Sequence, residues 1–154
     1  MKKNKVVATI EARMTSSRLP GKVLMTAAGK TMLEHMIDRV KLVKGIDEII
    51  IATTVNLADD EICKLAKKNK VSYYRGSEND VLDRVLKAAQ FFEADIIIEL
   101  TADCPVIDHN IIEQSLNIFK SHKVDYVSNV IIRSYPDGMD TQVFKTETLL
   151  AQVS

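Results

Sequence analysis

The sequence has little of what marks disulfide-stabilised, zinc-binding or membrane proteins. It holds two cysteines, Cys63 and Cys104, with neither a CxxC spacing nor a histidine pair at zinc-finger spacing. Neither a disulfide framework nor a structural zinc site is indicated, and a reducing compartment fits best. No apolar run approaches the roughly 20 residues that cross a bilayer, and the run at residues 6–10 is too short for a secretion signal. We therefore expect a soluble, cytoplasmic protein without a membrane partner.

An excess of charge of one sign is also missing, because 21 Lys and Arg residues offset 21 Asp and Glu residues. Proteins that coat nucleic acid or anionic membranes use a strong positive field, so we expect no nucleic-acid partner, and any anion site must be local. The composition, 46% hydrophobic and 27% charged, is that of an ordinary folded domain and excludes intrinsic disorder. No repeat, low-complexity segment or linker divides the chain, which predicts a single domain over residues 1–154.

Short runs rich in Val and Ile alternate with stretches of helical period. This pattern predicts an α/β fold of three layers, with a mainly parallel sheet covered by helices. We expect strands at residues 6–12, 48–54, 71–75, 96–101, 126–130 and 141–144, and helices at 32–43, 60–69, 81–92, 110–122 and from 146 onward. Thr31 with Glu34 predicts a capping box at the start of the helix at 32–43, and Gly45 predicts the end of that helix. Asp59 is expected to cap the helix at 60–69.

Two long connections, residues 14–30 and 131–140, begin at the carboxyl ends of predicted strands, where open α/β sheets bind their ligands. The stretch from Arg13 to Lys30 also contains Arg18 and Lys22 but no acidic residue. Gly21 and the small residues at 15–17 would let backbone amides approach phosphate oxygens, and the cations would neutralise them. A polyphosphate is the natural ligand, although composition alone leaves a solvated basic loop equally open.

Five segments resemble the cytidylyltransferases that activate acidic sugars, such as the CMP-KDO and CMP-sialic acid synthetases. The resemblance is greatest to the subgroup of the spore coat polysaccharide biosynthesis protein F type. In order, the segments are residues 10–24 (IEARMTSSRLPGKVL), 52–54 (ATT), 75–84 (RGSENDVLDR), 101–108 (TADCPVID) and 135–140 (YPDGMD). They extend over essentially the whole chain.

This resemblance implies a nucleotide-diphosphate-sugar transferase (Rossmann-like) fold, with CTP bound over the first half of the sheet. It assigns the triphosphate to Ala12, Arg13, Arg18 and Lys22, and places Arg75 near the base and ribose. It also implies a sugar as second substrate, a role in surface polysaccharide biosynthesis and a homodimer. We expect Asp80 to cap the helix that follows Arg75, and Asp83 and Arg84 to face water.

Asp103 follows a buried strand and should project toward the same crevice as the basic loop. A hard divalent cation on a polyphosphate takes one or two protein carboxylates, so we expect Asp103 to hold Mg²⁺, with Asp140 as a second candidate ligand. Arg13, Lys22 and Asp103 form the predicted catalytic group. A turn-capping role for Asp103 is the simpler alternative, and Cys104, with no recognisable base nearby, is expected to be a packing residue.

The sequence departs from the subgroup at three positions. Glu11 stands where Gln or Pro is usual, and Thr15 and Ala102 each stand where Gly is usual. Family members also continue beyond the point where this chain stops, so we expect it to be truncated relative to them. The leading hypothesis is transfer of CMP from CTP to an acidic sugar with release of pyrophosphate. Two alternatives stay open: a glycosyltransferase of related fold that uses a nucleotide-sugar, and a non-catalytic nucleotide-binding protein.

Overall fold

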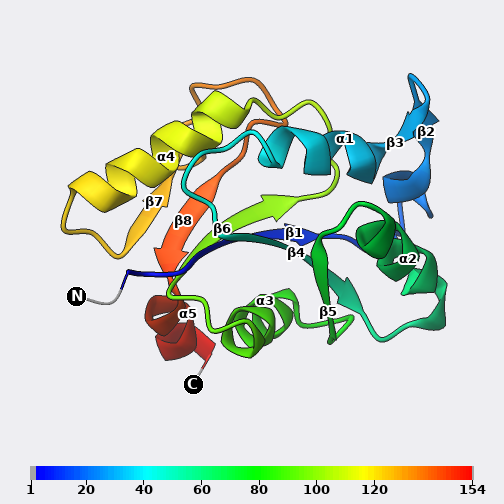
Figure 1. The fold of residues 1–154 in the computed structure, drawn as a ribbon, viewed down its shortest axis with the longest axis horizontal. Coiled ribbons are helices and arrows are strands. Elements are labelled where there is room, and N and C mark those ends of the chain that lie inside the picture. The colour runs from blue at the N-terminus through cyan, green and yellow to red at the C-terminus, as the bar shows by residue number, and fades with distance from the viewer. Residues whose placement is uncertain (1–2, 154) are drawn as a thin grey trace.

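The sheet has six strands in the order β5-β4-β1-β6-β8-β7 (Figure 1). A computed structural model describes residues 3–153 of the chain. The strands are β1 (Val6–Glu11), β4 (Glu48–Thr54), β5 (Ser72–Gly76), β6 (Ile96–Thr101), β7 (Tyr126–Ser128) and β8 (Gln142–Lys145). The first four run parallel, whereas β8 pairs antiparallel with both β6 and β7. The prediction of a mainly parallel sheet is therefore confirmed, with one strand inserted in the opposite direction.

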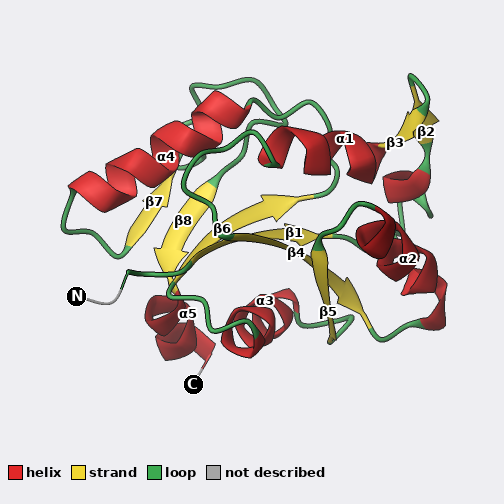
Figure 2. Cartoon of the chain, in the orientation of Figure 1, coloured by secondary structure: helices red, strands yellow, loops and turns green. Residues whose placement is uncertain are grey.

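Helices cover both faces of the sheet and give the three predicted layers (Figure 2). They are α1 (Met32–Val40), α2 (Asp60–Lys68), α3 (Val81–Phe91), α4 (His109–Ser121) and α5 (Thr146–Val153). One core cluster joins α1, α2 and α4 to the sheet, and a second cluster joins α3 and α5 to the opposite face. Among the described residues, no helix is long and apolar enough to cross a membrane.

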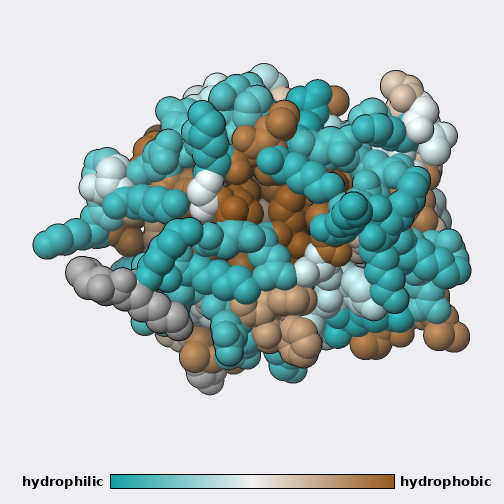
Figure 3. Space-filling model, viewed as in Figure 1, coloured by the Kyte–Doolittle hydropathy of each residue, from teal (hydrophilic) through white to brown (hydrophobic). Residues whose placement is uncertain are grey.

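The alternation of side chains along β1 explains how one strand serves two cores. Val6, Ala8 and Ile10 belong to the cluster under α1 and α4, whereas Val7 belongs to the cluster under α3. Residues of odd number at the end of β1 therefore face α3, which places Glu11 on that side. Figure 3 shows hydrophobic side chains gathered in the middle of one face, with hydrophilic side chains over most of the rest.

The largest differences from the predicted elements lie between β1 and β4. The long basic connection contains a small hairpin, β2 (Thr26–Ala27) with β3 (Lys30–Thr31). Helix α1 begins at the predicted capping box but ends at Val40; the Leu42 and Val43 amides then donate to carbonyl oxygens three residues back, and the chain turns through Gly45, whose φ is 87°. Gly45 therefore serves the turn into β4 rather than the helix end.

Candidate functional site

A pocket of about 240 Å³ lies at the carboxyl ends of β1 and β6, which are neighbouring parallel strands. The connection from β1 leads to β4 on one side, and the chain later crosses to β6 on the other, so the pocket lies where the strand order reverses. Its lining residues are Glu11, Ala12, Arg13, Ser16, Ser17, Arg18, Lys22, Val23, Val81, Arg84, Thr101, Ala102 and Asp103. The structure thus brings the predicted site residues of one segment, Ala12, Arg13, Arg18 and Lys22, together with Asp103, which is distant in sequence.

The basic loop that forms one wall is closed at its base by backbone hydrogen bonds. The Gly21 amide donates to the Met14 carbonyl oxygen at 2.9 Å, and the Met14 amide donates to Asp59 Oδ1 at 2.8 Å. Gly21 has a φ of 71°, a left-handed conformation in which any larger residue is strained. Residues 15–20 therefore project as a short loop over the pocket. Lys30, the remaining cation of this segment, lies outside the pocket and pairs with Asp38.

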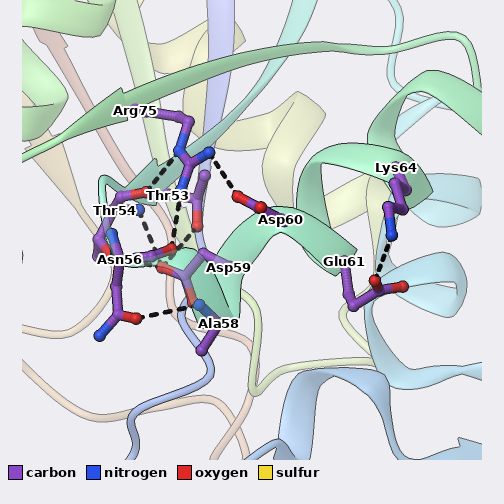
Figure 4. Close-up of polar contacts among 9 residues, drawn as sticks. All are labelled: Thr53, Thr54, Asn56, Ala58, Asp59, Asp60, Glu61, Lys64 and Arg75. Carbon is purple, nitrogen blue, oxygen red and sulfur yellow. Dashed lines mark hydrogen bonds and ion pairs between the residues drawn. The ribbon is translucent and has the colours of Figure 1, made fainter.

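Asp59 anchors this loop to β4. Its buried carboxylate accepts hydrogen bonds from the Thr53 and Thr54 hydroxyls and the Thr54 amide (Figure 4). It also accepts the hydrogen bond from the Met14 amide. The prediction that Asp59 caps a helix is wrong in its chemistry, because the side chain makes no capping hydrogen bond with α2. The carboxylate instead joins the start of the basic loop to the end of the neighbouring strand.

Lys22 and Asp103 form an ion pair across the pocket, with Nζ 2.7 Å from Oδ2. Partial burial raises the pKa of Asp103, but its contacts with Lys22 and Thr101 outweigh this and bring the pKa below its ordinary value. Asp103 is therefore ionised at neutral pH and stays partly exposed, at 43% of its side chain. Burial raises the pKa of the neighbouring Cys104 thiol, which fits a packing residue rather than a nucleophile.

Glu11 lies at the α3 side of the pocket, beside a second carboxyl group. Burial, followed by the hydrogen bond and charge of Glu99, raises the pKa of Glu11 to about 9. Glu11 is thus uncharged at neutral pH, and its departure from the family pattern adds no negative charge to the pocket.

The prediction that Arg84 faces water is wrong. Only 2% of the residue is exposed, and it lines the pocket from the first turn of α3. The helical period contains the signal, because position 84 lies on the same face of α3 as the partly buried Val81 and the buried Val85 and Ala88. Asp80 is the N-cap, as predicted, and accepts from the Asp83 amide at 2.9 Å.

The structure does not bring Arg75 or Asp140 into the pocket. The Arg75 guanidinium donates to the Thr54 and Asn56 carbonyl oxygens and to Asp60 Oδ1, which ties β5 to the β4–α2 connection (Figure 4). Asp140 is exposed just before β8, close enough to Cys104 for its charge to raise that thiol's pKa, but it is not among the lining residues.

Comparison with known proteins gives the chain its family. The family model described as cytidylyltransferase matches residues 7–151. The chain is a member of the cytidylyltransferase family. A solved cytidylyltransferase from Leptospira borgpetersenii superposes with a TM-score of 0.93 at 37% identity, covering 97% of this chain and 63% of that one. The predicted nucleotidyltransferase-type fold is confirmed.

Two curated relatives of this cytidylyltransferase-family chain have named activities or pathways. The spore coat polysaccharide biosynthesis protein SpsF of Bacillus subtilis is 31% identical over 151 residues, covering 96% of this chain and 62% of that protein. The 8-amino-3,8-dideoxy-manno-octulosonate cytidylyltransferase of Shewanella frigidimarina is 33% identical over 123 residues, covering 79% of this chain and 50% of the enzyme. The chain therefore spans between half and two thirds of the length of these relatives.

Proposed function

We propose that this chain carries the CTP-binding site of an enzyme that transfers CMP from CTP to an acidic sugar and releases pyrophosphate, in the biosynthesis of a surface polysaccharide. The observation that carries the proposal is the convergence of Arg13, Arg18 and Lys22 with Asp103 in one pocket between β1 and β6. The Shewanella relative supports an acidic sugar as acceptor, and the Bacillus relative supports the pathway.

The donor set around Asp103 fits a magnesium ion carried by a polyphosphate. No group of three or more His, Cys, Asp or Glu side chains within residues 3–153 is arranged to hold a metal. Mg²⁺ on a nucleotide needs no such cage, because it takes one or two protein carboxylates and fills its other positions with phosphate oxygens and water. Asp103, ionised and partly exposed, would hold the ion, which would neutralise charge developing on the phosphates.

In this mechanism the protein's own side chains bind and orient the triphosphate. Lys22 exchanges its contact with Asp103 for a phosphate oxygen, which frees the carboxylate for the cation. Arg13 and Arg18 supply fork-shaped donors to the phosphates that depart. The sugar hydroxyl oxygen then bonds to the α-phosphorus and loses its proton to water, as the bond from that phosphorus to the bridging oxygen breaks and pyrophosphate leaves with that oxygen. The residues act mainly by positioning and by charge stabilisation.

The first experiment is a thermal-shift series with CTP, UTP, GTP, ATP and CMP, each with and without Mg²⁺. Wild type is compared with Arg13→Ala, Asp103→Ala and, as a control, Lys64→Ala, whose exposed ion pair with Glu61 lies on α2. CTP at 100 times its Kd stabilises a fold by about 2.7 kcal/mol. We expect this shift in wild type and the control, a reduced shift in both site variants, and loss of the Mg²⁺ increment in Asp103→Ala.

A pyrophosphate-release screen with acidic sugars follows. CTP binding without release for any sugar would favour a non-catalytic binding protein, and preference for a nucleoside-diphosphate sugar over CTP would favour a glycosyltransferase. No shift with any nucleotide would overturn the proposal for this chain. The homodimer implied by the resemblance stays a prediction, which light scattering on a sizing column tests directly.

A further inference from the structure

The basic loop of residues 15–20 is held by hydrogen bonds at its base, on the side of the pocket where Asp59 and β4 lie. Within residues 3–153, no hydrogen bond holds the side chains of Ser16, Ser17 or Arg18, although all three line the pocket. The position of these side chains therefore depends on what holds the loop on the opposite side, toward α3.

Thr15 supplies a contact on that side. Its hydroxyl donates to Oε1 of the Glu78 carboxylate, in the connection between β5 and α3. A carboxylate acceptor makes this a charge-assisted bond, which is roughly twice as strong as a neutral one. The two residues are 63 positions apart, so the bond joins segments that only the fold brings together. Thr15 is also a position at which this chain departs from its subgroup, where the usual Gly has no hydroxyl.

Glu78 holds the first cation of the basic segment as well. Arg13 Nη1 donates to the Glu78 carbonyl oxygen at 3.3 Å, so one residue accepts two hydrogen bonds from this segment, one through its main chain and one through its side chain. The neighbouring Ser77 accepts a bond from Arg84 Nη1 in the same way, at its carbonyl oxygen. The β5–α3 connection thus positions two of the guanidinium groups that line the pocket.

The bond between Thr15 and Glu78 lies behind the pocket wall. Neither residue is among those that line the pocket, whereas Arg13 and Ser16, which flank Thr15 at a distance of one or two residues, both are. A ligand can therefore fill the pocket without breaking this bond. A loop that is ordered before the ligand arrives loses less conformational entropy on binding, which raises affinity.

We propose that the hydrogen bond between Thr15 and Glu78 is a latch that holds the basic loop and Arg13 in the conformation that binds a polyphosphate. Thr15 and Glu78 are positioning residues, since they act through the loop. The inference rests on the proposed function for the identity of the ligand. It predicts an equilibrium between a latched loop, which binds, and an open loop, which does not. Loss of one hydrogen bond to a charged group shifts this equilibrium about tenfold toward the open loop.

Two measurements on the whole protein follow the two states of the loop. Trypsin cleavage after Arg18 in the absence of ligand measures the open fraction, and calorimetry with CTP and Mg²⁺, or with inorganic tripolyphosphate, measures the latched fraction through the Kd. Wild type is compared with Thr15→Val and Glu78→Met, which remove the bond but keep side chains of similar size, and with the double variant. In each variant the increase in cleavage rate multiplied by the increase in Kd should be about tenfold. The double variant should match the single variants, because the bond is already lost in each.

The controls separate the latch from a general loss of stability. Thr15→Ser, which keeps the hydroxyl, should restore both values to those of wild type, and Thr26→Val, at an exposed position of β2 in the same connection, should change neither. Equal urea midpoints for all variants would show that cleavage reports the loop rather than global unfolding. Saturating tripolyphosphate should suppress cleavage after Arg18 in every variant, because only the latched loop binds it.

Three results would overturn the latch while leaving the proposed function intact. They are a product of the two changes close to one in both single variants, additive changes in the double variant, and cleavage of Thr15→Val that saturating tripolyphosphate does not slow. If wild type binds neither CTP nor tripolyphosphate, the proposed function fails, and the positioning role of the latch fails with it whatever the cleavage rates.

Discussion

Glu11 shows at the residue scale how packing reverses the meaning of a charged residue. An ionised Glu11 would place a negative charge beside the triphosphate, whereas burial and the Glu99 carboxyl raise the pKa of Glu11 from 4.5 to about 9. Two carboxyl groups on the same face of adjacent strands do not both ionise without a large cost in free energy, so the folded state retains a proton that the unfolded chain has released. Pairing between strands brings these groups together, and no local pattern predicts it.

The pH dependence of stability follows from this proton. Between pH 4.5 and about 9 the folded state binds more protons at Glu11 than the unfolded state, so the free energy of unfolding should fall as pH rises. Glu11→Gln keeps the shape of the side chain and an uncharged donor toward Glu99. Its free energy of unfolding should exceed that of wild type at pH 8 and should change less with pH between 4.5 and about 9. Urea denaturation at pH 6 and 8 measures both. Glu61→Gln, an exposed control, should follow the wild-type profile; identical profiles for Glu11→Gln and wild type would contradict the expectation.

At the scale of elements, the sequence predicts the strands and helices because hydrophobic period is local. The residues that join elements are harder to predict. The local sequence predicts Arg75 as a site residue and Asp59 as a helix cap. In the structure each forms hydrogen bonds with a segment that the fold brings near. The reversed direction of β8 and the hairpin in the basic connection also depend on pairing between strands, which the period of either strand does not specify.

Removing the junction at Asp59 should weaken both the fold and the site. Asp59→Ala leaves the buried Thr53 and Thr54 hydroxyls and the Met14 amide without their acceptor, and should cost about 2–4 kcal/mol of unfolding free energy. Because Met14 begins the basic loop, the variant should also bind CTP more weakly. Denaturant titration and calorimetry measure the two effects. The control is Asp60→Ala, which removes one partly exposed ion pair with Arg75 and should lower the free energy of unfolding by less than about 1 kcal/mol. If the two variants lose the same unfolding free energy, Asp59 does not join the basic loop to β4 as the structure indicates.

At the scale of the whole molecule, the order of the motifs predicts the fold and the place of the pocket. The carboxyl ends of parallel strands meet at one edge, so the sequence alone predicts that Arg13 and Asp103 lie together. The α3 wall of the pocket is not predicted in this way, because the burial of Arg84 depends on the packing of α3 against β1, β4 and β5.

The balance of charge over the whole molecule sets the final prediction. Since 21 cations offset 21 anions, no global field attracts polyanions, and binding depends on the few cations gathered in the pocket. Raising salt from about 0.05 to 0.5 M shortens the screening length roughly threefold, so CTP affinity should fall about tenfold. A DNA duplex, which needs an extended positive surface, should not bind even at the lower salt. Fluorescence anisotropy with labelled duplex and with labelled CTP measures both, and tight duplex binding at low salt would show that the positive surface extends beyond the pocket.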